Sequence, residues 1–212
     1  MALIVSPLHP GFASTSEHKS TPLLGTACRG LQSLFIDRGS DQESRERIVQ
    51  QISDRQSAIE DDCAEYNPFL VFAEGTTSNG SGLMKFKRGA FYGMRTVVPV
   101  YIKLGQRYLM STYDVVAFWP YLVLYFSSFA FQCVTVTIMP EFTPTQWMLD
   151  NHSQKGSADW EIFAECVREV MVKHGGFNKE ERPIREKLAY EAFMNGEKET
   201  CELDGRVFTH SR

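Results

Sequence analysis

The sequence predicts an α/β fold with a mostly parallel sheet and flanking helices, and two observations support this prediction. Short apolar runs alternate along the chain with segments in which apolar residues recur at helical spacing. The apolar runs are continuous, as in FLVFA at residues 69–73, which is typical of strands covered on both faces. With 212 residues and 43% hydrophobic content, the chain is large enough for one core, so we expect a single domain.

The first part of the chain is predicted to hold a strand, a turn and an exposed helix. The amino-terminal MALIVSPLHPGF has only a very short apolar run and no basic lead-in, so we expect a strand rather than a secretory signal. A second strand is predicted at residues 34–36. Ser40 and Glu43 then form a capping-box pattern, and apolar residues follow at broadly helical spacing through residues 48–59.

The strand at residues 69–73 ends at Glu74-Gly75-Thr76, and a loop of turn-forming residues follows it. Three later elements are predicted: a strand at 97–102, a helix at 160–171 that stops at Gly175-Gly176, and a helix from about Pro183 to Asn195-Gly196. Pro99 places its strand at an edge or a bulge, because proline cannot donate to the ladder. The tail after Thr200 is expected to be loose.

Residues 115–140 contain no charged side chain, which on length alone is enough to span a bilayer. Against a span, Pro120 interrupts its start, and valine and isoleucine alternate with threonine at residues 134–138 as in a strand. We expect an aromatic helix at roughly 118–130 followed by that strand. The helix is either a buried core element or a surface helix that dips into lipid.

Composition excludes some classes of function. The net charge is −4 and the basic residues are spread along the chain, so there is no footprint of nucleic-acid binding. The five cysteines form no C-x-x-C pair, which indicates reduced thiols in a cytosol-facing protein. The histidines and cysteines show no metal-ligand spacing, so no metal site is predicted.

Polar residues follow two of the predicted strands, at Asp37-Arg38 and at Glu74-Gly75-Thr76. Sites in α/β folds form at such strand ends. The guanidinium of Arg38 suits a phosphate group, Lys85, Lys87 and Arg88 add charge near the second strand end, and the Glu74 carboxylate accepts hydrogen bonds. Each has a plainer alternative: Arg38 in a surface salt bridge, Glu74 as a turn residue, the lysines as a solvated face.

Gly75 and Gly80 have the spacing of a phosphate-binding P-loop, but Ser81-Gly82 stands where Lys-Ser/Thr is required, so a P-loop is not predicted.

Several ordered motifs resemble those of the glycerophospholipid acyltransferase family. FAEGT at residues 72–76, FKRGAF at 86–91 and VPV at 98–100 resemble its F-P-E-G-T, F-K-x-G-A-F and V-P-V series. Upstream, PLLG at 22–25 and FIDR at 35–38 resemble the branch that reacylates lysophosphatidylcholine or lysophosphatidylethanolamine. The likeness covers roughly residues 10–175. Its departures are Ala73, where the family usually has proline, and insertion-like residues 93–96.

The resemblance implies roles for individual residues. Arg38 and Glu74-Gly75-Thr76 would bind the phosphate and polar head of the glycerolipid acceptor, with Lys87 a weaker candidate, and Pro99 would shape the acyl-CoA side. Acyl-CoA is a co-substrate and no other cofactor is implied. The implied partners are the lipid acceptor, acyl-CoA and the cytosolic face of an internal membrane such as the endoplasmic reticulum. Residues 1–175 are then a partial acyltransferase-like domain, and 176–212 a carboxy-terminal helix and loose tail.

The family's catalytic histidine belongs to an N-H-x-x-x-x-D motif, in which His deprotonates the acceptor hydroxyl and Asp orients the His. No histidine of this sequence has Asp five residues later. In the family the motif lies just before the segment that matches residues 2–5. We therefore expect either an amino-terminally truncated form of an active enzyme or a shortened, inactive relative.

The inactive form would be a non-catalytic protein that binds lipid or acyl-CoA. A soluble nucleotide-binding domain is a third, weaker alternative.

Overall fold

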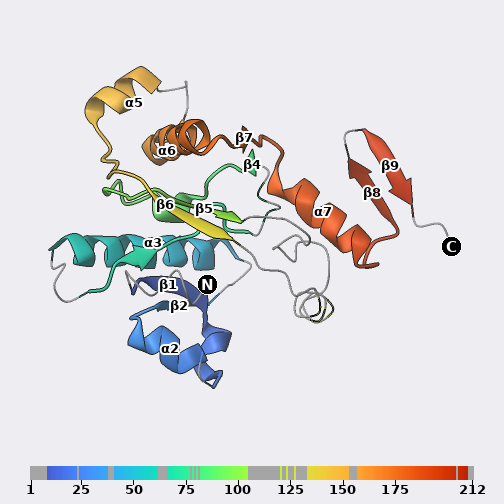
Figure 1. Ribbon diagram of the computed structural model, residues 1–212, viewed down its shortest axis with the longest axis horizontal. Coiled ribbons are helices and arrows are strands. Elements are labelled where there is room, and N and C mark those ends of the chain that lie inside the picture. The colour runs from blue at the N-terminus through green and yellow to red at the C-terminus, as the bar shows by residue number, and fades with distance from the viewer. Residues whose placement is uncertain are drawn as a thin grey trace. The chain divides into compact units, whose positions relative to one another are not determined.

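A computed structural model describes residues 9–22, 24–37, 41–61, 66–76, 78, 80, 82–104, 120, 123, 127, 133–152, 157–203 and 205–209. Its strands are β1 Gly11–Thr15, β2 Leu34–Ile36, β3 Phe69–Leu70, β4 Gly82–Leu83, β5 Val100–Leu104, β6 Val134–Ile138, β7 Asn178–Lys179, β8 Thr200–Leu203 and β9 Arg206–Thr209 (Figure 1). Its α-helices are α2 Leu24–Gly30, α3 Gln42–Asp61, α5 Gln146–His152, α6 Asp159–Gly175 and α7 Ile184–Met194, with 3-10 helices η1 Ser16–Ser20 and η2 Arg88–Ala90.

The predicted α/β class is confirmed by the strand pairing. β1 lies at the centre of a three-stranded sheet, parallel to β2 on one side and to β3 on the other. β4 and β7 are also parallel, while β5–β6 and β8–β9 are antiparallel. Parallel pairing requires long crossover connections, and α3 provides the one between β2 and β3.

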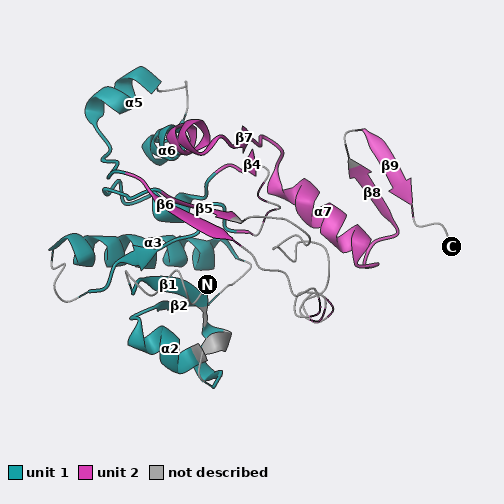
Figure 2. Cartoon of the chain, viewed as in Figure 1, with its two compact units in different colours: residues 1–75, 86–99, 140–167 teal, residues 76–85, 100–139, 168–212 magenta. Residues whose placement is uncertain are grey.

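The chain divides into two compact units, shown in different colours in Figure 2. Unit 1 consists of residues 1–75, 86–99 and 140–167, and unit 2 of residues 76–85, 100–139 and 168–212. Each unit is therefore assembled from segments that are distant in the sequence.

Helix α3 begins with a cap that differs from the predicted one. Ser40 lies outside the described residues, and the capping carboxylate belongs to Asp41. Its Oδ2 accepts a hydrogen bond from the Ser44 backbone N–H at 2.8 Å, and its Oδ1 accepts one from the Ser44 hydroxyl at 2.8 Å. Both hydrogen bonds hold the pKa of Asp41 below its ordinary 3.8, and the bond from the Ser44 backbone N–H has the larger effect.

The Asp41 cap predicts a pH-dependent helix start. Because the folded state lowers the pKa of Asp41, the stabilisation is present above the ordinary value of 3.8 and is lost as pH falls through the folded pKa. We expect the protection factor of the Ser44 amide, which compares its exchange rate with that of an unstructured amide at the same pH, to fall at such low pH, and Asp41→Ala to lower it at neutral pH as well. Asp41→Asn is the matched control, since asparagine caps without titrating. Equal Ser44 protection factors in all three proteins at both pH values, measured by amide hydrogen exchange, would contradict this assignment.

Aromatic residues build the core of unit 1. Phe163 of α6 is fully buried and lies edge-on to Phe91, with ring centroids 5.4 Å apart, and it stacks against Phe142 at 6.0 Å. Ile52 is the buried residue of α3, and its Cδ1 lies so near Gly89 that a β-carbon there would come within 3.2 Å. Segment 86–99 is therefore packed onto α3 through Gly89, and segment 140–167 is packed onto segment 86–99 through the ring of Phe91.

Two predicted strands have different bounds in the structure. The run at residues 69–73 is a strand only at Phe69–Leu70, and Phe72 is 54% exposed, so coverage on both faces does not extend to it. Pro99 precedes the first residue of β5, Val100, and Val97 forms only a single bridge, with Phe142. Proline thus marks the start of the strand, since it offers no N–H to the ladder.

In unit 2, β5 and β6 form a ribbon with two unlike faces. Paired residues place Ile102 opposite Val136, so their face is aliphatic, and Val136 is 39% exposed. Tyr101 lies on the other face, where it is buried. Its ring lies edge-on to Phe177 at 5.3 Å, and its hydroxyl hydrogen-bonds Nδ1 of His174 at 3.0 Å. The ribbon is thus attached to the carboxyl end of α6 through Tyr101.

The expected helix at 118–130 lies almost entirely outside the described residues, whereas the strand predicted after it is present as β6. Among the helices that the structure describes, none combines the length and the apolar character needed to cross a bilayer.

The carboxy-terminal tail is not loose as predicted, because residues 200–209 pair as the β8–β9 hairpin. Gly205, at φ 71°, makes the turn, and Val207 and Phe208 favour strand conformation. The division at residue 175 stays a prediction.

Candidate functional site

The turn after β3 holds Gly75 in a conformation that suits glycine. Its φ is 66°, and its N–H donates to the Phe72 carbonyl at 3.0 Å. The Lys87 N–H donates to the Ala73 carbonyl at 2.7 Å, which brings the Lys87 segment beside the turn. A β-carbon at Gly75 would lie 3.1 Å from Cγ of Lys87. Residues that are twelve positions apart are thus packed together, and glycine makes the close approach feasible.

The other predicted site residues have different environments. Glu74 is half-buried in the same turn and takes part in an interaction, and Pro99 is buried. Arg38 lies outside the described residues. The structure therefore brings Glu74, Gly75 and Lys87 together within unit 1.

Thr76 belongs to unit 2, where its hydroxyl accepts a hydrogen bond from Nζ of Lys187 at 3.1 Å. Lys187 lies in the first half of α7, 111 positions along the chain. This lysine was not among the predicted site residues, and its position four residues into a helix of mixed composition gave no signal.

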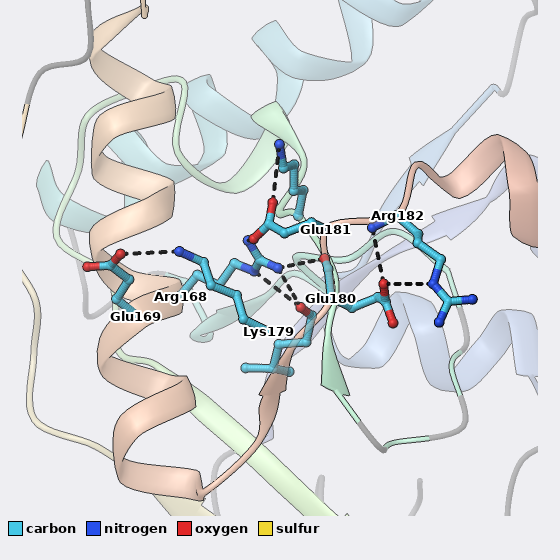
Figure 3. Close-up of polar contacts among 8 residues, drawn as sticks. Arg168, Glu169, Lys179, Glu180, Glu181 and Arg182 are labelled. Carbon is cyan, nitrogen blue, oxygen red and sulfur yellow. Dashed lines mark hydrogen bonds and ion pairs between the residues drawn. The ribbon is translucent and has the colours of Figure 1, made fainter. Parts of the chain in front are cut away.

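Arg168 of α6 is the charged residue around which unit 2 is organised (Figure 3). It is wholly buried, and it donates to the Leu83 carbonyl from Nε at 3.2 Å and from Nη2 at 2.8 Å. Nη2 also donates to the Glu180 carbonyl at 2.6 Å, and Nη1 to the Glu181 carboxylate at 2.9 Å. One guanidinium therefore joins α6, β4 and the segment after β7.

Glu181 shares its carboxylate between two cations, Arg168 and Lys85, whose Nζ lies 3.4 Å from Oε2. Partial burial opposes its ionisation, but the hydrogen bond and charge of Arg168, followed by those of Lys85, outweigh burial and lower the pKa of Glu181. Lys85, a predicted source of charge for the site, is thus already paired with a carboxylate.

In unit 1 the turn carries the Glu74 carboxylate beside the Lys87 segment, and in unit 2 the Thr76 hydroxyl is bonded to Lys187. A lysine ammonium and a threonine hydroxyl both donate to phosphate oxygens, and a glutamate accepts from hydroxyl groups. Among the residues that the structure describes, no three carboxylate, histidine or cysteine side chains gather as metal ligands. The chemistry that these groups favour is recognition of a phosphate and of neighbouring hydroxyls.

Comparison with known proteins relates the chain to one family. Residues 2–103 match the family model "Acyltransferase". The chain is 32% identical over 173 residues to a lysophosphatidylcholine acyltransferase of Drosophila melanogaster, with 81% of this chain and 30% of that protein covered. It is 30% identical over 175 residues to lysophosphatidylcholine acyltransferase 2 of Mus musculus, with 82% and 29% covered. It is 25% identical over 167 residues to the lysophospholipid acyltransferase LPEAT2 of Arabidopsis thaliana, with 79% and 30% covered.

The chain thus spans about 30% of the length of these relatives. Among solved structures, it is similar to the 1-acyl-sn-glycerophosphate acyltransferase PlsC of Thermotoga maritima, with a TM-score of 0.42 and 16% identity, over 82% of this chain and 59% of that one.

Proposed function

Because this chain belongs to the acyltransferase family, we propose that the protein it forms, or forms part of, transfers an acyl group from acyl-CoA to a lysophospholipid. The observation that carries the proposal is the family match at residues 2–103, which includes the turn at residues 74–76 and the segment around Lys87. The relatives named above are lysophosphatidylcholine and lysophospholipid acyltransferases, which supports a lysophospholipid as the acceptor.

In the proposed reaction, the free hydroxyl of the lysophospholipid attacks the thioester carbonyl of acyl-CoA. A new ester bond forms, the carbon–sulfur bond breaks, and CoA leaves as the free thiol. A general base takes the hydroxyl proton. The family's base is the histidine of N-H-x-x-x-x-D, and this sequence contains no histidine with Asp five residues later. The proposal for this chain therefore concerns the acceptor site, and a form that supplies the His/Asp pair would carry out the transfer.

The assigned acceptor residues are Arg38, Glu74, Gly75 and Thr76, with Lys87 as a further cation and Pro99 on the acyl-CoA side. The Lys87–Ala73 hydrogen bond supports this assignment, because it brings a lysine beside the turn that carries Glu74. The guanidinium of Arg38 and the ammonium of Lys87 would neutralise the acceptor phosphate. The substrates are amphipathic, so we propose that the protein works on the cytosolic face of an internal membrane, such as the endoplasmic reticulum.

Glu74→Gln tests the proposal. In a form of the protein that contains the His/Asp pair, we expect acyl transfer to fall by about tenfold or more, because a charged hydrogen-bond acceptor for the substrate is lost. Arg38→Ala should act in the same direction. Glu43→Gln is the matched control, since Glu43 is 81% exposed at the start of α3. Release of free CoA thiol measures turnover, and normal turnover in both site variants would refute the site assignment.

A second candidate function is a non-catalytic protein that binds lipid or acyl-CoA. The observation that favours it is the missing H-x-x-x-x-D pattern among the histidines of the sequence. Such a protein would bind lysophospholipid or acyl-CoA and release no thiol. Mapping the amino terminus of the endogenous protein separates the two candidates, because an upstream N-H-x-x-x-x-D favours the enzyme and a start at Met1 favours the binding protein.

A further inference from the structure

One face of helix α3 holds the segment at residues 86–99, which carries two of the proposed site residues. Ile52 packs beside Gly89, and Gln56 Nε2 donates to the Ala90 carbonyl at 2.9 Å. Ile52 and Gln56 are four residues apart in α3, so they lie on the same face of the helix. The helix and the segment both belong to unit 1, so these contacts lie within one compact unit (Figure 2).

The insertion-like residues 93–96 extend this contact along α3. Arg95 donates from Nη1 to the Glu60 carboxylate at 2.6 Å and from Nη2 to the Ser57 hydroxyl at 3.1 Å. Glu60 is four residues after Gln56, so it continues the same face of the helix. Residues that depart from the family pattern therefore attach the segment to α3 at a second place.

Two backbone features show that these contacts shape the segment. A β-carbon at Gly93 would lie 2.8 Å from Oγ of Ser53, so the segment approaches α3 very closely there. Met94 has a φ of 49°, in the left-handed region that residues with a side chain rarely adopt, and its N–H donates to the Phe91 carbonyl at 3.0 Å. Such a conformation persists only where its surroundings impose it. The contacts of Arg95 with α3, one residue later, help to impose it.

The same segment brings Lys87 to the turn after β3. The Lys87 N–H donates to the Ala73 carbonyl at 2.7 Å, and η2 begins at the next residue. The last residue of η2 is Ala90, whose carbonyl accepts the bond from Gln56. The short 3-10 helix is thus held at one end by the turn and at the other by α3. A shift of Ala90 relative to α3 would therefore move Lys87 relative to the turn.

The amide of Gln56 is only half satisfied. Its Nε2 is bonded to Ala90, but its Oε1 is buried and has no hydrogen-bond partner among the residues that the structure describes. A buried oxygen without a partner destabilises the folded state and offsets the gain from the Nε2 bond. The contact with Ala90 therefore fixes a position in the backbone while it adds little net stability.

We propose that Gln56 and Arg95 are positioning residues for the acceptor site. Through their contacts with the segment, α3 holds Lys87 beside the turn that carries Glu74, where its ammonium meets the phosphate of the acceptor. This inference rests on the proposed function, because it takes Lys87 to be a cation that binds this phosphate. Both residues act through the backbone of the segment rather than by touching the substrate.

A double-mutant cycle of lipid binding to this chain tests the inference. Neutral detergent micelles are doped with 1-oleoyl-lysophosphatidic acid, or with 1-oleoylglycerol as the phosphate-free comparison. Gln56→Met keeps the length of the side chain and removes both the bond and the unpaired oxygen, and Lys87→Gln removes the proposed cation. Gln50→Met is the matched control, because the Gln50 amide bonds to Asp54 within the same helix, at 2.8 Å.

We expect Gln56→Met to weaken lysophosphatidic acid binding about threefold and Lys87→Gln to weaken it about tenfold. Because Gln56 acts through Lys87, Gln56→Met should have no further effect in the Lys87→Gln background. Binding of 1-oleoylglycerol and the urea midpoint should stay unchanged, as should all binding in Gln50→Met.

Three results of the cycle would overturn the inference. Unchanged lysophosphatidic acid binding in Gln56→Met would show that the contact with Ala90 does not matter for the site. An additive loss in the double variant would show that Gln56 does not act through Lys87. Equal losses for the two lipids, together with a lower urea midpoint, would indicate a structural role.

Amide hydrogen exchange measures the positioning directly, since the Lys87 N–H is bonded to the Ala73 carbonyl. We expect its protection factor to fall in Gln56→Met and in Arg95→Ala, and the protection of the β5–β6 ribbon to stay unchanged. Arg47→Ala is the control for the second variant, because Arg47 pairs with a glutamate of α3 itself, at 3.3 Å. An unchanged Lys87 protection factor in both variants would also overturn the inference.

An acyl-transfer assay on a form that contains the His/Asp pair separates this inference from the proposed function. A raised acceptor KM in Gln56→Met, with kcat and the acyl-CoA KM unchanged, would support both. A normal acceptor KM in Gln56→Met, with a raised one in Lys87→Gln, would refute the positioning role alone. The expected binding cycle with no acyl transfer would refute the transfer reaction and leave the positioning role intact.

Discussion

Replacing Arg168 with alanine is expected to lower the free energy of unfolding by about 3–5 kcal/mol, the usual effect of breaking a buried charged network. The guanidinium is wholly buried and donates to the carbonyls of Leu83 and Glu180 and to the Glu181 carboxylate. Alanine would leave the Glu180 carbonyl without this donor and open a cavity beside β4. Urea denaturation followed by circular dichroism measures the change.

Two further variants show whether geometry or charge is responsible. Arg168→Lys keeps the charge, but a lysine ammonium lacks the planar fork that lets arginine reach several acceptors at once. We therefore expect its free energy of unfolding to lie between those of the wild type and the alanine variant. Arg182→Ala is the matched control. Arg182 is 57% exposed and pairs with Glu180 at 3.3 Å, and such surface pairs are worth about 0–1 kcal/mol. Equal losses in Arg168→Ala and Arg182→Ala would contradict the organising role of Arg168.

Phe163→Ala is expected to cost about 3–5 kcal/mol of stability, because truncating a buried aromatic ring removes its apolar contacts and leaves a cavity. Phe163 is fully buried between Phe91 and Phe142, which come from segments far apart in the sequence. The loss should therefore appear as disorder in both segments, seen as faster amide exchange. Urea denaturation gives the free energy.

Phe72→Ala is the control for this prediction, since it makes the same substitution in unit 1 at a side chain that is 54% exposed. We expect it to cost less than about 1 kcal/mol. A smaller loss in Phe163→Ala than in Phe72→Ala would show that the aromatic cluster does not stabilise unit 1.

The sequence was informative wherever a signal was local. The strands at residues 34–36 and 134–138 and the helices containing Ile52 and Phe163 were predictable, because the spacing of apolar residues is a local signal of strand or helix. The exposure of Val134, Val136 and Ile138 on β6 was not, because that spacing does not say what covers the apolar face. Strand bounds were less predictable. β3 stops after Leu70 because pairing with β1 ends there, and pairing is a property of both strands.

The candidate site was predictable only in part for the same reason. The turn at residues 74–76 is predictable because Gly75 within it is a local signal for a turn. The proximity of Lys87 follows from the short segment that joins it to this turn. Arg168 carried a usable signal that was missed, since it lies four residues after Ala164 on the apolar face of α6, where a charged residue must find partners. Lys187 had none, because its contact with Thr76 depends on the pairing of β4 with β7.

The β4–β7 pairing also sets the order in which the molecule can be completed during synthesis. Leu83 emerges from the ribosome long before its partner Lys179. Thr76 likewise emerges long before Lys187, its hydrogen-bond partner 111 positions further along. Closing a loop of this length is entropically costly, and parallel, long-range pairing is slow compared with helix formation. The core of unit 1 also cannot form until late in synthesis, because its buried residue Phe163 is translated late. A nascent chain that stalls before α6 would therefore contain the whole turn at residues 74–76. It would still lack the aromatic core around Phe163 and the hydrogen-bond network of Arg168.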